Sequence, residues 1–520
     1  MSFAKVSSAQ TSLLKAHIVG VEVDLSNGLH AFSVVGLPDK AVAESKDRVS
    51  AAIKNTGFKS PKKKNQKVVV ALAPADIKKE GPSFDLAIAL AYLLAAKEIF
   101  FNPKGKLFLG ELSLDGELRP VPGVLPLVEE ARKRGFAEVY VPTENVREAA
   151  LIGNIDVFAV NTLKEILGHL NTKTIDENKH IQKVILEPVP ATDIVPSVYS
   201  SSVDFGDIKG QNDAKRGLLI AAAGGHNVAL YGPPGTGKTM LAKAFASILP
   251  PLSFDEILEV TSIHSVAGLL KEDLVTEPPI RSPHHTSSYV SLVGGGSIPK
   301  PGEITLAHRG VLFLDEFPEF DKRVIETLRQ PLEDRVVSVT RARGSAKFPA
   351  HFILIAAMNP CPCGNHGSKG KECICSPINI QRYERKLSGP IVDRIDMWIE
   401  VPPISHALLS DTENDKPESD EIRKQVMNIR HTQGLRFKKH GIDIKTNSEI
   451  RGKDVLNLAN LTPKAKEVLN FSAQKHDLSA RAYHRVVRLA RTIADIEKSE
   501  PVTDGHILEA LQYRPKKKDL

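Results

Sequence analysis

The stretch Gly232-Pro-Pro-Gly-Thr-Gly-Lys-Thr239 decides the fold of this 520-residue chain. It has the spacing G-x-x-x-x-G-K-[ST], follows the apolar run Val228–Tyr231 and leads into an apolar, helix-like segment over residues 240–249. A strand, a glycine-rich turn and a helix in this order point successive backbone N–H groups at phosphate oxygens, beside a helix N-terminus that favours negative charge. Lys238 would reach the β- and γ-phosphates, and Thr239 would hold Mg²⁺. We therefore predict an ATP site built from Gly232, Pro233, Pro234, Gly235, Thr236, Gly237, Lys238 and Thr239.

Length and composition set broad limits. A chain of 520 residues predicts about three domains, and 42% hydrophobic with 25% charged residues is typical of globular proteins. The formal charge of +7 allows a polyanionic partner without requiring one. The longest apolar run, residues 86–96, is too short to span a bilayer, and the N-terminus has no signal-type apolar region. We expect a cytoplasmic protein with no membrane partner, in a compartment where thiols stay free or bind metal.

The first 170 residues show a mixed pattern of strands and helices. Alternating residues 19–25 and 29–35 flank an Asn-Gly turn signal and predict a β-hairpin. A helix is expected to residue 55, a strand over 67–73, an apolar helix over 86–96 and a hairpin within 108–123, followed by further α/β elements. The basic run 59–67 is either a solvated loop or a nucleic-acid contact. Residues 171–203, polar and rich in Pro and Ser, predict a linker.

Gly81-Pro-Ser83 and its surroundings resemble the proteolytic domain of Lon, which has an S5-type fold. Ser83 matches the nucleophile position, but the position of the partner lysine falls on Leu125. A Ser–Lys dyad needs an amine close enough to take the hydroxyl proton, and leucine has none. The resemblance therefore implies a Lon-protease-like α+β domain that has lost its protease chemistry. Ser83 is then expected to be the N-cap of the following helix.

The apolar strand Val311–Leu314 ends in the acidic pair Asp315-Glu316. Asp315 can hold Mg²⁺ through water, and Glu316 can orient and polarise the attacking water. A further apolar strand, residues 352–358, ends at Asn359, whose amide would sit beside the γ-phosphate and position water. Together with the P-loop, these residues predict a Mg²⁺-dependent ATPase.

Three arginines are candidates for completing this site. Arg394 is the preferred arginine finger, reaching into a neighbouring subunit's site, where a guanidinium is worth about 10³–10⁵ in rate. A surface salt bridge is the alternative for Arg394, and Arg385 is the weaker rival for the role. The segment 478–491 resembles the second sensor helix of AAA+ proteins, with Arg481 as the matching arginine. Arg488 and the later Arg491 are expected on a solvated face of that helix.

Two insertions resemble the helix-2 insert and the pre-sensor-1 hairpin of the magnesium-chelatase and MCM-helicase branch of AAA+ proteins. They are residues 261–302 and residues 334–348. The second predicts a β-hairpin with Arg341, Arg343 and Lys347 near its tip. These basic residues favour contact with DNA phosphates, and a solvated hairpin is the alternative. The pair His284-His285 lies in the first insertion. Adjacent side chains on a regular element point in different directions, so we expect a loop or pore role rather than a metal pair.

All four cysteines of the chain fall within fifteen residues, as Cys361, Cys363, Cys373 and Cys375. Four clustered thiols in a reducing compartment favour one tetrahedral Zn²⁺ that closes a polar loop. Free thiols and a redox pair remain the alternatives, because C-x-C is less diagnostic than C-x-x-C.

The whole order resembles the ComM/YifB family of magnesium-chelatase-like proteins over nearly the full length. The more specific signatures are Gly36-Leu-Pro-Asp39, Leu72-Ala-Pro-Ala-Asp76, Asn359-Pro-Cys-Pro-Cys363 and Ser479-Ala-Arg-Ala-Tyr-His-Arg485. The resemblance implies a ring, expected to be hexameric, that hydrolyses ATP and drives branch migration of DNA when transforming strands are integrated. Its partners would be single-stranded or branched DNA, further copies of the chain, and recombination proteins. A magnesium-chelatase-type metal-insertion subunit and a protein-remodelling or protease-coupled unfoldase are the alternatives.

The expected architecture is α/β with six segments. They are a Lon-protease-like domain (1–170), a linker (171–203), an AAA+ P-loop NTPase core of the magnesium-chelatase type (204–403), a flexible joint (404–421), a helical lid (422–513) and a basic tail (514–520).

Overall fold

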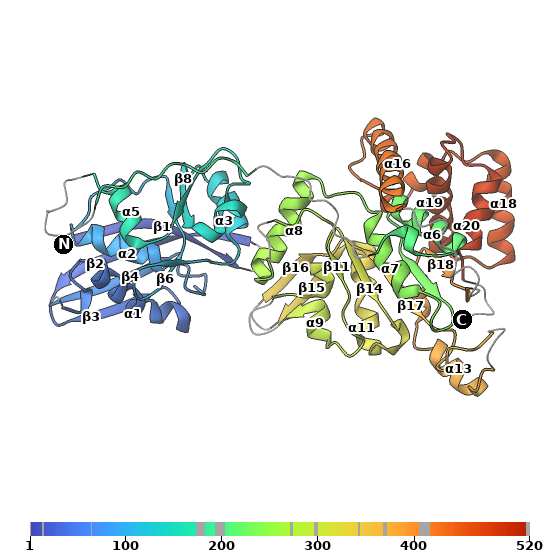
Figure 1. Cartoon of the computed structure of the whole chain (residues 1–520), viewed down its shortest axis with the longest axis horizontal. Coiled ribbons are helices and arrows are strands. Elements are labelled where there is room, and N and C mark those ends of the chain that lie inside the picture. Colours follow the sequence, from blue (N-terminus) through green and yellow to red (C-terminus); the bar gives the residue numbers. More distant parts are fainter. Residues whose placement is uncertain are drawn as a thin grey trace. The chain divides into compact units, whose positions relative to one another are not determined.

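The structure of the protein is a computed structural model. It describes residues 2–12, 15–63, 65–172, 182–192, 203–270, 274–295, 300–341, 344–367, 372–404 and 417–515. The chain divides into two compact units, residues 1–195 with 254–275, and residues 196–253 with 276–520 (Figure 1). No helix in these described ranges is long and apolar enough to cross a membrane.

The first unit is built on a seven-stranded mixed sheet in the order β3-β4-β2-β1-β5-β8-β9. Its elements are β1 (Ser2–Ser12), β2 (Lys15–Asn27), β3 (Ala31–Val35), α1 (Lys40–Asn55), β4 (Gln66–Ala73), α2 (Asp85–Ala95), β5 (Lys106–Phe108), β6 (Glu111–Leu112), β7 (Leu118–Arg119), α3 (Val124–Lys133), β8 (Glu138–Pro142), α4 (Val146–Ala149), β9 (Asp156–Val160), α5 (Leu163–Leu170) and α8 (Phe254–Ala267).

The predicted hairpin over residues 19–35 is wrong. The strand β2 pairs antiparallel with β1, from Ser2 opposite Leu25 to Ser12 opposite Lys15, and with β4 on its other side. The strand β3 pairs with β4 in parallel and does not touch β2 in the sheet. The Asn-Gly signal therefore marks a crossing over β4, because the long alternating strand β2 already has partners on both edges.

Two apolar clusters cover the sheet of the first unit. The helix α2 is apolar on nearly every side and is buried almost throughout, as expected for a core helix. It shares one cluster with α1 and α5, while α3 and α4 line the other. The helix α1 ends at Asn55 as predicted, and it begins after Asp39, whose carboxylate accepts the N–H of Val42 at 2.8 Å.

The middle of the predicted linker lies along the first unit. Within residues 182–192, the N–H of Val184 donates to the carbonyl of Gly168, and the N–H of Val189 donates to Val157 of β9. The segment forms no helix or strand, so its polar and Pro-rich pattern was informative about secondary structure. Residues 173–181 and 193–202 of that linker lie outside the described ranges, as does most of the predicted joint (405–416) and of the tail (516–520).

The second unit is built on a parallel sheet in the order β11-β14-β17-β10-β18. Its elements are α6 (Asn212–Gly224), β10 (Val228–Tyr231), α7 (Lys238–Ser247), β11 (Ile280–Arg281), α9 (Tyr289–Val293), β12 (Gly294–Gly295), β13 (Lys300–Pro301), α10 (Glu303–Leu306), β14 (Val311–Leu314), α11 (Lys322–Thr327), α12 (Arg329–Asp334), β15 (Val336–Arg341), β16 (Gly344–Pro349), β17 (Ile353–Met358), α13 (Pro377–Glu384), α14 (Gly389–Val392), β18 (Met397–Glu400), α16 (Ser419–Lys439), α17 (Asp454–Ala459), α18 (Pro463–Lys475), α19 (Ala480–Ile496) and α20 (Asp504–Gln512).

The C-terminal helices share one apolar core with the parallel sheet. Side chains of β10, β17 and β18 cluster with those of α6, α7 and the helices α16 to α20. The helix α20, which the sequence reading did not anticipate, packs on α18 and α19 (Figure 1). The chain continues in place beyond it, because the N–H of Trp398 donates to the carbonyl of Tyr513 at 2.8 Å. Arg514, the first residue of the predicted basic tail, is described as well, and its N–H donates to the carbonyl of Leu511 at 3.1 Å.

The helix α8 is the largest departure from the expected domain division. Its sequence falls within the predicted ATPase core, yet it clusters with the first unit. There Ser265 accepts the N–H of Gly123 at 2.9 Å and donates to Glu148 at 2.8 Å. Its Leu258 packs against the cluster that contains α3. The helix is held by apolar contacts and by buried hydrogen bonds, which a pattern local in sequence cannot reveal.

Candidate functional site

The glycine-rich turn joins β10 to α7, as predicted. Gly235 and Gly237 have φ of +79° and +88°, a left-handed region that disfavours side chains, and the space beside each is open. At Gly232 a Cβ would lie 2.2 Å from the carbonyl oxygen of Val401, so only glycine fits beneath the end of β18. The loop is therefore packed against the end of β18 at Gly232 and open beside Gly235 and Gly237, where a phosphate group fits.

Lys238 lies at the centre of the turn and is largely buried. Its Nζ donates to the carbonyls of Gly232 and Pro233, both at 2.8 Å, and to the side-chain oxygen of Asn359 at 3.1 Å. Burial lowers the pKa of this amine, while the charge of Asp315 opposes the shift. The structure thus brings Asn359, at the end of β17, to the predicted phosphate-binding lysine.

The two predicted Mg²⁺ ligands meet each other. The hydroxyl of Thr239 donates to a carboxylate oxygen of Asp315 at 2.8 Å. Because β14 and β10 are parallel and separated only by β17, their carboxyl ends meet at the same edge of the sheet. A hydroxyl and a carboxylate are oxygen ligands of the kind that Mg²⁺ prefers.

Glu316 follows at φ +50°, a left-handed conformation, and its side chain is exposed. Its carboxylate lies 3.1 Å from Nδ1 of His285. The His284 ring lies 4.1 Å from that of His285, and both residues lie on an irregular segment after β11, in agreement with the expected loop. His285 is a contact of the predicted catalytic glutamate that the sequence reading missed. Its place after β11, the strand beside β14, was the available signal.

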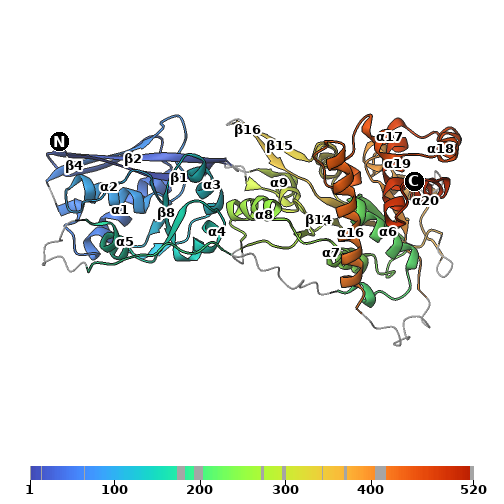
Figure 2. The same cartoon turned by 90° about the horizontal axis from the view of Figure 1, so that it is seen from above.

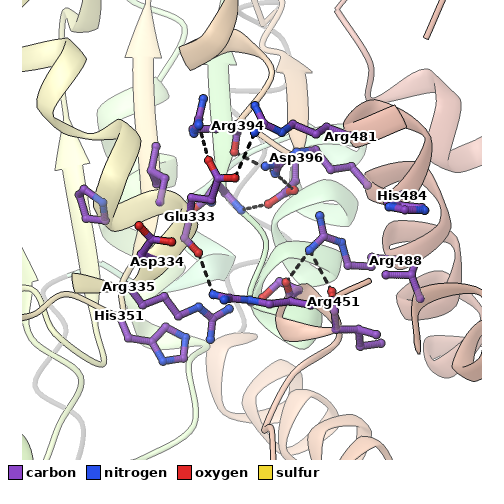
Figure 3. A pocket seen from close by; sticks show the side chains of 18 of the residues that line it. Glu333, Asp334, Arg335, His351, Arg394, Asp396, Arg451, Arg481, His484 and Arg488 are labelled. Atoms are coloured by element: carbon purple, nitrogen blue, oxygen red, sulfur yellow. Dashed lines mark hydrogen bonds and ion pairs between the residues drawn. The ribbon is translucent and has the colours of Figure 1, made fainter. Parts of the chain in front are cut away.

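Arg394 and Arg481 lie together on either side of Glu333 (Figure 3). Both are ion-paired to Glu333, Arg394 with one carboxylate oxygen and Arg481 with the other at 3.3 Å. Arg394 precedes β18, so it lies at the amino edge of the parallel sheet, whereas the glycine-rich turn follows β10 at the carboxyl edge. The structure therefore groups Arg394 and Arg481 around Glu333, apart from Lys238 of the same chain.

These arginines border a polar cavity of about 300 Å³. Figure 3 shows Glu333 reaching between Arg394 and Arg481, with Arg488 and Arg451 on the other side of the space. Basic side chains outnumber acidic ones in the lining, which includes Arg335, His351, Arg394, Arg451, Arg481, His484, Arg485 and Arg488 against Glu333, Asp334 and Asp396. An anionic group would be attracted to such a cavity.

The prediction of a solvated face for Arg488 and Arg491 is wrong. Arg491 is 3% exposed; it pairs with Asp495 at 2.9 Å and donates to the carbonyl of Ser499 at 2.6 Å. Arg488 donates to the carbonyls of Ser448 and Ile450. Both guanidinium groups donate hydrogen bonds to backbone carbonyls of neighbouring segments, so they stabilise the helical region rather than face water.

A buried ionic group around Asp396 forms part of the cavity wall. Burial would raise the pKa of Asp396, but the charges of Arg485, His226 and Arg488 and the N–H of Asn227 outweigh it and lower that pKa to about 2. His226 is buried, and its Nε2 lies 2.8 Å from the hydroxyl of Thr492. Burial, together with the charges of Arg488 and Arg485, lowers the pKa of His226 to about 4 against the pull of Asp396. This histidine is therefore neutral at pH 7.

The four cysteines converge on one point. Their sulfur atoms all lie within 4.8 Å of one another, and no other such group of metal-type ligands occurs among the residues that the structure describes. Cys361 is buried, and a backbone hydrogen bond from Asn365 is the main cause that lowers the pKa of the Cys363 thiol to about 6. Thiolates gathered in this way can hold a tetrahedral metal ion.

The predicted hairpin is formed by β15 and β16, which pair antiparallel from Val336 opposite Pro349 to Arg341 opposite Gly344. It extends beyond the five-stranded sheet (Figure 2). Lys347 is exposed on β16. Arg343 lies outside the described residues, and the side chain of Arg341 does also, so the grouping of these three cations stays a prediction.

In the first unit, the predicted N-cap role of Ser83 is wrong, because α2 begins at Asp85 with Phe84 as its N-cap. The Asp85 carboxylate is fully buried and takes two hydrogen bonds from Arg48 of α1, at 2.6 and 3.1 Å. It therefore ties α1 to α2. Leu125 is 1% exposed within an apolar cluster.

Comparisons with known proteins agree with this architecture. Residues 204–409 match the family described as "Magnesium chelatase, subunit ChlI", residues 21–145 "Subunit ChlI of Mg-chelatase", and residues 416–514 "Magnesium chelatase, subunit ChlI C-terminal". The chain also has a partial similarity to "Lon protease 2" of Bacillus subtilis, with 31% identity over 30% of this chain and 33% of that protein.

Two relatives are similar over the full length. The chain is 40% identical to "Competence protein ComM" of Haemophilus influenzae over 99% of this chain and 98% of that protein. It is also 40% identical to "Uncharacterized protein YifB" of Salmonella typhimurium over 99% of this chain and 97% of that protein. The chain therefore belongs to the ComM/YifB family of magnesium-chelatase-like proteins.

Proposed function

We propose that the protein is an ATP-driven DNA motor that works as a ring, with helicase or branch-migration activity during homologous integration of DNA in natural transformation. The observation that carries the proposal is the division of its nucleotide machinery. Lys238, Thr239, Asp315 and Asn359 meet at the carboxyl edge of the parallel sheet, and Arg394 precedes a strand at the amino edge. Each half is incomplete, so two copies of the chain would supply one complete site.

The residues at the carboxyl edge fit Mg²⁺ and ATP. Open space lies beside Gly235 and Gly237, and the buried amine of Lys238 points at the loop's own carbonyls, where phosphate oxygens would be stronger acceptors. Thr239 and Asp315 would hold Mg²⁺, which neutralises phosphate charge when bound. Glu316 would orient and deprotonate a water molecule, and the Asn359 amide would fix its direction.

The division of the site also favours an assembly of more than one copy. The strand β10 has four residues, about 13 Å of backbone, between its two ends. Arg394 is additionally turned toward Glu333, away from its own glycine-rich turn. A closed ring of identical subunits, which we expect to be a hexamer, would present each Arg394 and Arg481 to the neighbour's nucleotide.

DNA is the polymer on which we propose that the motor acts. The hairpin of β15 and β16 projects an exposed Lys347, and its sequence adds Arg341 and Arg343 near the tip. Basic side chains on a projecting hairpin favour phosphate contact without sequence preference. The full-length relative named a competence protein supports a role with DNA during transformation, with recombination proteins as further partners in the cytoplasm.

We also propose that Cys361, Cys363, Cys373 and Cys375 hold a structural Zn²⁺. The support is the convergence of four thiols from the two ends of one loop. Metal binding would close a segment that is too polar to fold by burial alone.

Two alternatives make different predictions. The first alternative is a metal-insertion subunit of the magnesium-chelatase type. The Lon-like similarity and the cysteine group are features that we do not expect in such a subunit. A protease-coupled unfoldase would need an amine near Ser83, and the position expected for it is the buried Leu125. We therefore infer that protease chemistry is lost.

The test is the ATPase rate of the purified protein with forked, single-stranded and no DNA. The proposal expects stimulation by DNA, and retention of DNA in the presence of a non-hydrolysable ATP analogue. Glu316→Gln should bind ATP and DNA without moving a branch point. Absence of both stimulation and retention would reject the motor, and casein degradation that Ser83→Ala abolishes would favour the unfoldase.

A further inference from the structure

The loop that carries the four cysteines begins two residues after Asn359 and returns to the nucleotide site. Cys361 follows Asn359 and Pro360 directly, and it is fully buried. After Cys375 the chain enters α13, whose Tyr383 side chain is buried and hydrogen-bonded to the backbone of Asn359. The residues on both sides of the cysteine group are therefore anchored at Asn359, the residue whose side-chain oxygen contacts Lys238.

The spacing of the sulfur atoms fits a bound metal ion. Cys361 and Cys363 are 3.4 Å apart, and each lies 3.7 Å from Cys373. A tetrahedral ion with metal–sulfur bonds of about 2.3 Å separates its ligands by about 3.8 Å. Three thiols at this spacing, with Cys375 within 4.8 Å of each and no disulfide among the four, form the ligand set of a thiophilic cation such as Zn²⁺.

The same loop presses on the glycine-rich turn. Gly364 is buried at φ +80°, and a Cβ there would lie 2.5 Å from Cδ of Pro234 and 3.0 Å from its Cγ. The N–H of Gly364 donates to the carbonyl of Cys361 at 2.9 Å, and the N–H of His366 donates to the Cys361 sulfur at 3.3 Å. The turn Cys361 to Gly364 is thus shaped around the sulfur group and abuts Pro234, next to the carbonyl that Lys238 contacts.

We infer that metal binding by the four cysteines controls nucleotide affinity, by holding the Gly364 turn against Pro234 and Asn359 beside Lys238. The inference rests on the proposed nucleotide site and assigns that site a regulator. Without the ion, the two ends of the loop are held by contacts between thiols and by backbone N–H to sulfur hydrogen bonds, such as that from Ile374 to Cys363, and the loop loses its strongest link. Release of the loop frees Pro234 and Asn359 together, so the phosphate-binding turn loses support on two sides.

Gly364 and Gly367 provide a matched pair of variants in this loop. Both are glycines at positive φ, +80° and +74°, so a Cβ strains the backbone equally at each. Only Gly364 meets the nucleotide site, since nothing lies within 4 Å of a Cβ on Gly367. Gly364→Ala should weaken binding of a non-hydrolysable ATP analogue by about tenfold or more while zinc is retained, and Gly367→Ala should stay within about twofold of the unchanged protein.

The metal itself is tested on the full chain. The protein should contain about one Zn²⁺ per chain, and its release by an organomercurial should weaken analogue binding by about tenfold or more. Thiol reductant with ZnCl₂ should restore the affinity in the presence of constant Mg²⁺. This reversal shows that any loss is not irreversible unfolding.

The inference is overturned if the metal-free protein binds the analogue as tightly as the loaded one, if Gly364→Ala binds like Gly367→Ala, or if no stoichiometric metal is present. Failure of the proposed function looks different. If the zinc-loaded protein does not bind the analogue at all, the nucleotide site is wrong. If it binds the analogue and the metal controls that binding, yet DNA has no effect, only the motor is wrong.

Discussion

The most informative perturbation is Arg394→Ala, because the structure separates this guanidinium from the glycine-rich turn of its own chain. The residue precedes β18 and is held by Glu333 and by the carbonyl of Pro390 at 2.8 Å. We expect Arg394→Ala to retain binding of ATP and to lose hydrolysis, because the side chain acts only in a neighbour's site. The loss should be about 10³–10⁵ in rate, which corresponds to about 4–7 kcal/mol of transition-state stabilisation.

Subunit mixing measures whether the residue acts across copies. Lys238→Ala removes the phosphate-binding amine but keeps Arg394, and Arg394→Ala does the reverse. In a random equal mixture, a site is intact when its own subunit keeps Lys238 and its neighbour keeps Arg394, which holds for about a quarter of the sites. ATPase activity should therefore return to about a quarter of that of the unchanged protein, although each variant alone is inactive.

Arg481 and Arg385 sharpen the experiment. The structure pairs Arg481 with Arg394 on Glu333, so Arg481→Ala should also recover when it is mixed with Lys238→Ala. Arg385 is exposed after α13 and serves as the control, since its alanine variant should keep nearly full activity. If the mixture of Lys238→Ala and Arg394→Ala stays inactive while mixed assembly is verified by mass spectrometry, the reasoning from the opposite sheet edges is refuted.

Three further predictions follow from other contacts. His285→Ala should lower kcat with little change in ATP affinity, because His285 contacts the Glu316 carboxylate at 3.1 Å; a changed affinity with an unchanged kcat would contradict this role. The pKa of His226 is about 4 in the folded protein and about 6.5 in the unfolded chain, so between these pH values only the unfolded chain binds the proton. Between pH 7 and pH 4, the free energy of unfolding should therefore fall by about 3 kcal/mol more in the unchanged protein than in His226→Gln. Denaturant titrations at the two pH values measure this difference. Arg341→Ala with Lys347→Ala should keep basal ATPase and lose stimulation by DNA, and normal branch migration by that double variant would refute the hairpin assignment.

Local patterns in the sequence predicted the parts of the site that are built from short segments. The glycine spacing, the apolar strands and the residues that end them were enough to place Lys238, Asp315 and Asn359 at one edge, because the carboxyl ends of parallel strands meet there. The capping aspartate before α1 and the hairpin of β15 and β16 were equally local. Asn27-Gly28 misled for the same reason, since a turn signal does not say which strand the chain pairs with next.

Partners distant in sequence could not be read in this way. Nothing near Glu333 in the chain announces that it pairs with Arg394 and Arg481, and nothing in α8 announces that Ser265 bonds to Glu148. The arginines of α19 looked like a solvated face because their periodicity is basic. The structure buries Arg491 instead, against carbonyls at the ends of other segments.

The sequence by itself determined that this chain has a P-loop, an acidic strand end and a cysteine group, because each depends on residues that are neighbours in the chain. Only the tertiary structure decided how these parts meet. It placed Arg394 and Arg481 on the edge opposite Lys238, and it set Gly364 of the cysteine loop against Pro234. The physical reason is that strand direction and close packing act between segments far apart in sequence, where no local pattern records the partner.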